Sequence, residues 1–229
     1  MKPSPLLRTP WRLTCQAIPF VLLVACGQPH RPIQDDGSAV DESVRPLLVG
    51  AISAATPAGQ APPTDSVVLI RKQASVVPGM TLYLATYSPP NTADVTHVAV
   101  AASRQGRQQL VSNPSDWARL AAGWLPKAEG DAATACAEVI AFATENRYDR
   151  QGPTLYRGPG SLRGVLVTDS AALVSALAAP SATRQESGWT VDLWMVDTPG
   201  AVRYRCRLGN GFAEIEKNEQ LSAGGYLRF

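Results

Sequence analysis

Alternating apolar and polar residues in the last third of the chain predict an antiparallel meander. Three consecutive runs, residues 189–195, 202–208 and 213–215, place an apolar side chain at every second position. Such alternation is typical of strands that bury one face. The dipeptides Pro199-Gly200 and Asn210-Gly211 lie between the runs and suit tight turns. The pattern therefore predicts three antiparallel strands that share one buried face.

Two-residue turns at these dipeptides also predict which residues lie opposite one another. The first turn sets Leu193 opposite Cys206, and the second sets Cys206 opposite Ile215. In these registers the apolar side chains share one face, while the other face carries acidic and basic residues in cross-strand pairs. Pairs of opposite charge stabilise antiparallel sheets. If the second turn shifts by one residue, the two faces stay the same but the cross-strand pairs change, so the faces are the firmer prediction.

One large aromatic residue departs from the charged face of this meander. The predicted register places Trp194 beside Arg205, where a cation–π contact is available. An exposed tryptophan flanked by arginines is a composition that interface anchors favour. We therefore predict a binding surface formed by Trp194, Arg205 and Arg207. In the alternative interpretation, Trp194 shields the sheet or lies beneath the apolar segment 47–55.

The middle of the chain contains signals for further strands and helices. Apolar runs predict strands at residues 67–70, 81–87, 95–102 and 109–112, with a hairpin turn at Gln105-Gly106. Cap residues and helical spacing predict helices at residues 114–124 and 131–147. A strand at 162–167 and a helix at 170–178 follow. The predicted fold class is α+β, an antiparallel sheet with helices packed mainly on one face, and residues 66–229 form a single domain.

The first 25 residues have the layout of a secretory signal peptide. Lys2, Arg8 and Arg12 precede a short apolar stretch that ends in Leu23-Val24-Ala25-Cys26. This ending resembles the lipobox of bacterial lipoproteins. The resemblance implies that the Cys26 thiol receives a diacylglycerol and that a peptidase cuts before it. A cleaved signal without lipid, or a chance cysteine after an apolar run, is the alternative.

The resemblance implies a place for the protein in the cell. A lipid on Cys26, with two or more acyl chains, would anchor the chain stably to a membrane. The predicted location is therefore the cell envelope, at the outer membrane if the cell is Gram-negative, with the domain in the periplasm or at the surface. Residues 26–65, rich in Pro, Gly, Ser and Asp, are predicted to form a flexible tether. Residues 47–55 within it are apolar enough to form a short helix or to dock on the domain.

Two cysteines remain after the leader and the lipidated position. Cys136 lies on the apolar side of the second predicted helix, and Cys206 on the apolar face of the middle meander strand. A helix packed across this sheet brings the two together, and an oxidising compartment permits a disulfide between them. The alternative is a pair of free buried thiols.

Composition excludes several classes of protein. Hydrophobic residues make up 45% of the 229 residues and charged residues 17%, which excludes a wholly disordered chain and a polytopic membrane protein. The formal net charge of +2 is too small to indicate a nucleic-acid partner.

Candidate catalytic chemistry in the sequence is sparse. His97, with Asp94 three residues before it, is a weak candidate for a general base. No zinc-binding spacing of Cys and His occurs, and we expect neither a metal nor a cofactor. Polar and aromatic residues at 146–150 and 156–157 are compatible with a ligand site or with a capped helix end.

These observations lead to one principal functional hypothesis and two alternatives. The principal hypothesis is a lipid-anchored envelope protein that acts as a binding or assembly module without catalysis, with another envelope protein as a possible partner. The first alternative is a small periplasmic hydrolase with its site near His97. The second is a spacer with no specific ligand.

Overall fold

The computed structural model describes residues 42–58, 68–90, 96–143, 154–162, 175–197 and 200–222. The chain divides into two units, Met1–Arg31 and Pro32–Phe229, and every described residue belongs to the second. The predicted leader with Cys26 and the cluster at 146–150 lie outside the described residues. So do nearly all of the strand predicted at 162–167 and the first part of the helix predicted at 170–178.

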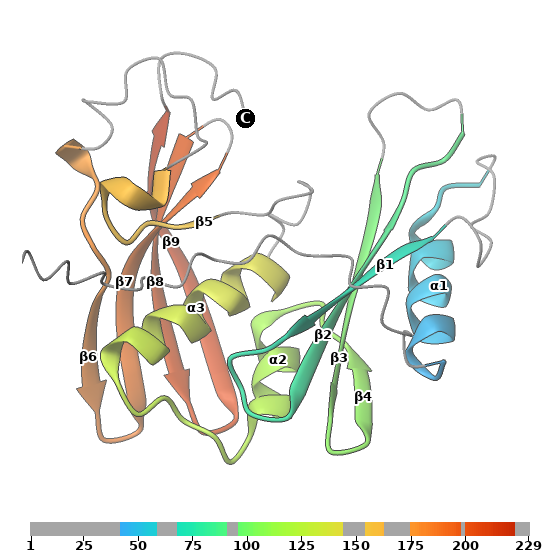
Figure 1. The fold of residues 1–229 in the computed structure, drawn as a ribbon, viewed down its shortest axis with the longest axis horizontal. Helices are drawn as coiled ribbons and strands as arrows, with labels where there is room; N and C mark the ends of the chain where they lie inside the picture. Colours follow the sequence, from blue (N-terminus) through green and yellow to red (C-terminus); the bar gives the residue numbers. More distant parts are fainter. Residues whose placement is uncertain are drawn as a thin grey trace, which may run out of the picture. The chain divides into compact units, whose positions relative to one another are not determined.

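The fold class is α+β, as predicted, and its strands form two antiparallel sheets (Figure 1). The first sheet has the order β1-β2-β3-β4. Its strands are β1 (Leu69–Ala74), β2 (Met80–Tyr87), β3 (His97–Arg104) and β4 (Arg107–Leu110). Gln105 and Gly106 join the last two strands with φ angles of 52° and 76°. Both are positive, as the tight hairpin predicted at this dipeptide requires.

The second sheet contains the predicted meander. Its strands are β5 (Thr154–Leu155), β6 (Ser181–Gln185), β7 (Gly188–Asp197), β8 (Gly200–Gly209) and β9 (Phe212–Ser222). The order is β5-β7-β8-β9, and β6 also pairs with β7. Strands β7, β8 and β9 are the three that the alternation predicted, whereas β6 was not predicted, because its sequence is short and polar.

Besides the strands, the described residues include three α-helices, one 3-10 helix and two helical residues at 175–176, within the helix predicted at 170–178. They are α1 (Val44–Ala55), α2 (Pro114–Ala121), α3 (Glu129–Ala143) and η1 (Pro159–Leu162). None of the described helices has the length and apolar character needed to cross a membrane.

Helix α2 begins at the predicted position, and the backbone groups at both of its ends have hydrogen-bond partners. The Asn113 side chain accepts a 3.0 Å hydrogen bond from the Asp116 amide, and the Asp116 carboxylate accepts from the Asn113 amide at 3.2 Å. These reciprocal bonds form a capping box. At the other end, Arg104 of β3 donates to the carbonyl oxygens of Leu120 and Ala122 at 2.6 and 3.0 Å.

The two faces of the first sheet pack against different helices. In β2 and β3, odd-numbered residues such as Tyr83 and Ala85 belong to a cluster with the buried face of α1. Even-numbered residues of the same strands, such as Leu82 and Val100, belong to the main core, which also contains residues of α2, α3 and the second sheet. This division follows directly from the two-residue period of a strand.

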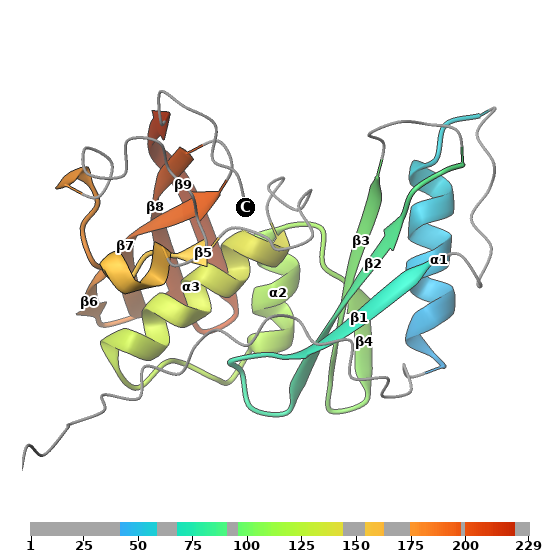
Figure 2. The same cartoon turned by 45° about the horizontal axis from the view of Figure 1, so that its top comes forward.

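Helix α1 lies within the segment that the sequence predicted to be a tether. Its residues Val44, Leu48 and Ile52 recur every fourth position and are fully buried against the first sheet (Figures 1 and 2). Residues 47–55 therefore form the helix that was considered possible, and they dock on the domain. Consequently, packing against the domain begins at α1, before the boundary predicted at residue 66.

Helix α3 lies across the inner face of the second sheet, as the cysteine argument predicted (Figure 2). Cys136 of α3 and Cys206 of β8 are both fully buried and form a disulfide, with their Cα atoms 5.9 Å apart. The predicted disulfide is thus present in the structure.

The register of the meander agrees with the prediction at one turn and differs at the other. Cys206 lies opposite Ile215, as predicted, but opposite Val191 rather than Leu193. Strand pairing continues to Asp197 and Gly200, so Gly200 belongs to β8 and not to the turn predicted at Pro199-Gly200. The difference is two residues, which leaves every side chain on its predicted face.

Candidate functional site

The structure places Trp194 in the interior, and the predicted exposed anchor is therefore not found. Only 5% of its surface is exposed, and it packs with Val196, Ala201 and two residues from outside the meander, Tyr156 and Leu177. The predicted neighbour is also different, because Trp194 lies opposite Arg203 rather than Arg205. Trp194 is a packing residue that covers this face of the sheet, which was the alternative interpretation.

The two arginines of the predicted surface are exposed and paired with carboxylates. Arg205 donates to Asp192 over 3.2 and 3.3 Å. Arg207 lies 2.8 Å from Glu214, and both side chains of that pair are about 60% exposed. The charged face that the alternation predicted is therefore present beside the apolar cluster that covers Trp194. Arg207 and Glu214 also border a hollow.

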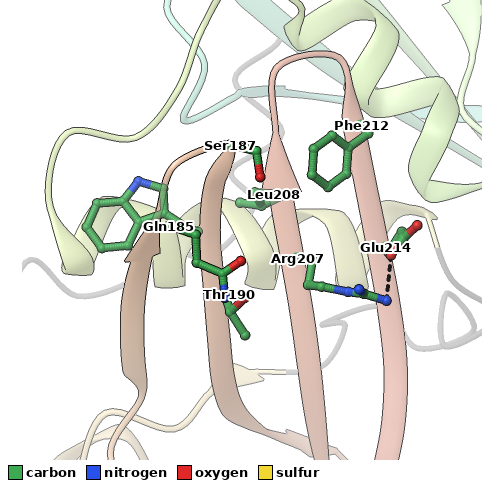
Figure 3. A pocket seen from close by; sticks show the side chains of 8 residues that line it. Gln185, Ser187, Thr190, Arg207, Leu208, Phe212 and Glu214 are labelled. Atoms are coloured by element: carbon green, nitrogen blue, oxygen red, sulfur yellow. Dashed lines mark ion pairs between the residues drawn. The ribbon is translucent and has the colours of Figure 1, made fainter.

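This hollow lies at the hairpin end of the second sheet and has a volume of about 330 Å³ (Figure 3). Strand pairing aligns two neighbouring rows of residues across β6 to β9 there. One row runs through Thr183, Thr190, Arg207 and Glu214; the other runs through Gln185, Gly188, Gly209 and Phe212. The middle of the second row has no side chains, because both positions are glycine. Gln185 and Phe212, at the two ends of that row, line the hollow together with residues of the first row.

Gly188 is required by the close approach of backbone atoms, whereas Gly209 leaves room for an aromatic side chain. A Cβ atom on Gly188, whose φ is +153°, would lie 1.9 Å from the Leu208 carbonyl oxygen. A Cβ atom on Gly209 would lie 1.8 Å from the ring of Phe212. The Phe212 ring therefore lies directly over Gly209, yet 39% of the residue remains exposed. Phe212 thus forms an aromatic wall of the hollow, which the buried residues Trp189 and Leu208 also line.

Three of the other lining residues carry groups that both donate and accept hydrogen bonds. Gln185, Ser187 and Thr190 line the hollow together with the Arg207–Glu214 ion pair (Figure 3). Thr190 is unusual among them. Its Oγ1 atom is shielded from solvent and has no hydrogen-bond partner among the described residues. A shielded hydroxyl without a protein partner costs free energy.

His97 lies at the start of β3, away from this hollow. Its ring stacks on Tyr87 of the neighbouring strand, with the centroids 6.3 Å apart and an interplanar angle of 20°. Asp94, its suggested partner, lies outside the described residues. In the described part of the chain, no group of three or more His, Cys, Asp and Glu side chains is arranged to hold a metal ion.

Two residues of the predicted polar and aromatic cluster have structural contacts. The Tyr156 amide donates a 2.9 Å hydrogen bond to the Trp194 carbonyl oxygen, and the Tyr156 side chain is buried. The Arg157 guanidinium donates 2.6 Å to the Thr134 hydroxyl of α3. These contacts attach the segment after β5 to the sheet and to α3.

A buried carboxylate in α3 was not identified from the sequence. Glu138 is only 6% exposed and accepts hydrogen bonds from Ser75, the Val76 amide and the Trp117 indole. Burial raises the pKa of Glu138 above its ordinary value of 4.5, and the three hydrogen bonds oppose that rise. The helical position of Glu138, between the apolar Ala137 and Val139, was the only available signal.

Comparison of the chain with protein-family models, with curated proteins and with solved structures finds no match.

Proposed function

We propose that the chain is a lipid-anchored envelope protein that acts as a binding module. The basic leader and the Leu23-Val24-Ala25-Cys26 sequence support the anchor on Cys26. The Cys136–Cys206 disulfide supports an oxidising compartment, because such bonds persist mainly outside the reducing cytoplasm. Anchor and disulfide point to the same place, a domain held at the outer side of a membrane.

The hollow bordered by Arg207, Thr190 and Phe212 is the observation that carries the binding role. It combines an exposed aromatic side chain, an ion pair and several hydrogen-bonding groups in one concave place. Ligand sites typically combine apolar walls with a few polar groups that fix orientation. Arg205 lies on the same charged face, outside the hollow, and is assigned to its rim.

The anchor is tested by substituting single cysteines in the full-length chain. Cys26→Ala should leave an uncut precursor or release the protein from membranes, and it should abolish incorporation of labelled palmitate. Cys15→Ala is the matched control, because it removes a leader thiol outside the lipobox. Normal labelling and cleavage of the Cys26→Ala protein would overturn the anchor.

The binding surface is tested by photo-cross-linking in intact cells. A benzoylphenylalanine at position 212 should give covalent adducts, because the side chain borders the hollow. The same residue at position 69 is the control, since Leu69 is 63% exposed and lies on β1 of the other sheet. Adducts at position 69 alone, or at neither position, would contradict a binding role for the hollow.

A further inference from the structure

We propose that the hollow at the hairpin end of the second sheet binds a neutral saccharide. The proposal rests on the binding role of this hollow and names the chemical class of its ligand. Three properties of the lining residues support it: balanced charge, paired donors and acceptors, and an aromatic wall.

The charges that line the hollow balance one another. Among the described residues that line it, Arg207 is the only cation and Glu214 the only anion, and their side-chain atoms lie 2.8 Å apart. An anionic ligand would have to displace the carboxylate of Glu214 from Arg207, and a cationic ligand would have to displace the guanidinium. A neutral ligand leaves this ion pair intact. The charge balance therefore favours a ligand without net charge.

The hydrogen-bonding groups match a ligand that carries several hydroxyls. The Arg207–Glu214 pair presents guanidinium donors beside carboxylate acceptors, so that neighbouring hydroxyls can accept from one and donate to the other. Gln185, Ser187 and Thr190 add groups that can do both. A saccharide offers adjacent hydroxyls of this kind, whereas an extended peptide offers mainly backbone groups that suit a strand edge.

Phe212 provides the apolar contact that a sugar ring also needs. One face of a pyranose consists largely of C–H groups, which pack on the face of an aromatic ring. The ring of Phe212 stands over Gly209 and remains partly exposed at the wall of the hollow. The volume of about 330 Å³ lies at the low end for ligand sites, which suits a short saccharide segment.

Thr190 supplies an independent indication that a polar ligand belongs here. Its shielded Oγ1 atom has no partner in the described structure, although the residue lines the hollow. The shielded hydroxyl becomes available to a ligand only if χ1 rotates to another staggered rotamer. A hydrogen bond that forms only on binding would explain a hydroxyl at this position.

The test is calorimetric titration of the intact protein with defined sugars. The probes are N-acetylglucosamine, chitotriose and maltotriose as neutral ligands, and trigalacturonate as an anionic one. We expect saturable binding of at least one neutral trisaccharide and none of trigalacturonate. Tighter binding of the trisaccharide than of the monosaccharide would indicate a glycan chain as the source, and equal binding a free sugar.

Two substitutions with matched controls locate the site. Thr190→Val should weaken binding about five- to tenfold through loss of one hydrogen bond, without lowering the melting temperature. Thr183→Val is its control, because Thr183 is the cross-strand neighbour of Thr190 and does not line the hollow. Phe212→Ala should weaken binding at least tenfold, whereas Leu69→Ala should leave it unchanged.

The proposal is overturned if no neutral sugar binds, if trigalacturonate binds as well as maltotriose and chitotriose, or if Thr190→Val and Phe212→Ala leave the affinity unchanged. In any of these cases, peptide adducts at position 212 in cells would keep the binding role and identify a protein ligand instead. If those adducts are also absent and no sugar binds, both the saccharide ligand and the binding role of the hollow are overturned.

Discussion

The indole Nε1 of Trp117 donates a 2.8 Å hydrogen bond to Oε1 of Glu138, and both side chains are buried. The same carboxylate accepts from the Ser75 hydroxyl at 2.5 Å and from the Val76 amide at 2.8 Å. These three donors come from α2 and from the turn between β1 and β2. Glu138 therefore links α3 to α2 and to the turn between β1 and β2, segments that are distant in the sequence.

This buried carboxylate predicts that stability falls as the pH rises. Because burial raises the pKa of Glu138 in the folded protein, the native state binds this proton more tightly than the unfolded state. The stabilisation is complete below the ordinary value near 4.5 and is lost as the pH rises through the folded-state pKa. The free energy of unfolding, measured by urea titration between pH 4 and pH 9, should decline over that window.

Glu138→Gln is the variant that isolates this effect. The amide keeps the shape of the side chain but does not titrate, so the decline should disappear. Its NH₂ group must face either the Val76 amide or the Trp117 indole, both of which are donors. We therefore expect a loss of about 1–3 kcal/mol at low pH. An unchanged pH dependence in Glu138→Gln would assign the decline to another group.

The disulfide predicts a large difference between oxidised and reduced protein. Cys136 and Cys206 are 70 residues apart, and closing a loop of that length contributes about 4 kcal/mol in the chain-entropy model. Urea unfolding with and without reductant should show a corresponding fall in the midpoint. The double variant Cys136→Ala/Cys206→Ala should resemble the reduced protein and should not respond to reductant. Coincident unfolding curves would show that the bond does not constrain the unfolded chain.

The burial of Trp194 predicts a stability effect at this position. Trp194→Ala removes the largest side chain of the cluster that contains Tyr156 and Leu177, and it should cost about 3–5 kcal/mol. Arg205→Ala is the control on the same face, because its pair with Asp192 is exposed and contributes about 1 kcal/mol or less. Equal melting temperatures for Trp194→Ala and Arg205→Ala would contradict the packing role.

The faces of the meander could be predicted from the sequence, but the residues that cover them could not. Alternation assigns Trp194 to the outer face, and the structure agrees. Its cover comes from Tyr156 and Leu177, which lie outside the three alternating runs. A pattern within strands contains no information about segments that fold back from elsewhere. For this reason, the neighbouring arginines suggested that Trp194 is exposed, whereas it is in fact packed under other side chains.

The disulfide could be predicted from the sequence, whereas the hollow could not. Cys136 and Cys206 could be paired because helical and strand periods each assign a face, and one packing arrangement satisfies both. The hollow lies where β7 and β8 pair Thr190 with Arg207 and Gly188 with Gly209. The predicted register was two residues away from the observed one, so it did not align these pairs. Consequently, Thr190 and Phe212 were not recognised as neighbours of the same hollow.

Helix α1 gives a final prediction about where the folded domain begins. Leu48 is fully buried between α1 and the first sheet, so Leu48→Ala should destabilise the protein by about 2–5 kcal/mol. Gly50 lies on the exposed side of the same helix, and a Cβ atom there meets nothing within 4 Å. Gly50→Ala should therefore stabilise the protein by about 0.5–1 kcal/mol, because glycine is unfavourable within a helix. Thermal unfolding of both variants measures the two effects. A flexible tether, by contrast, would leave the melting temperature unchanged in both.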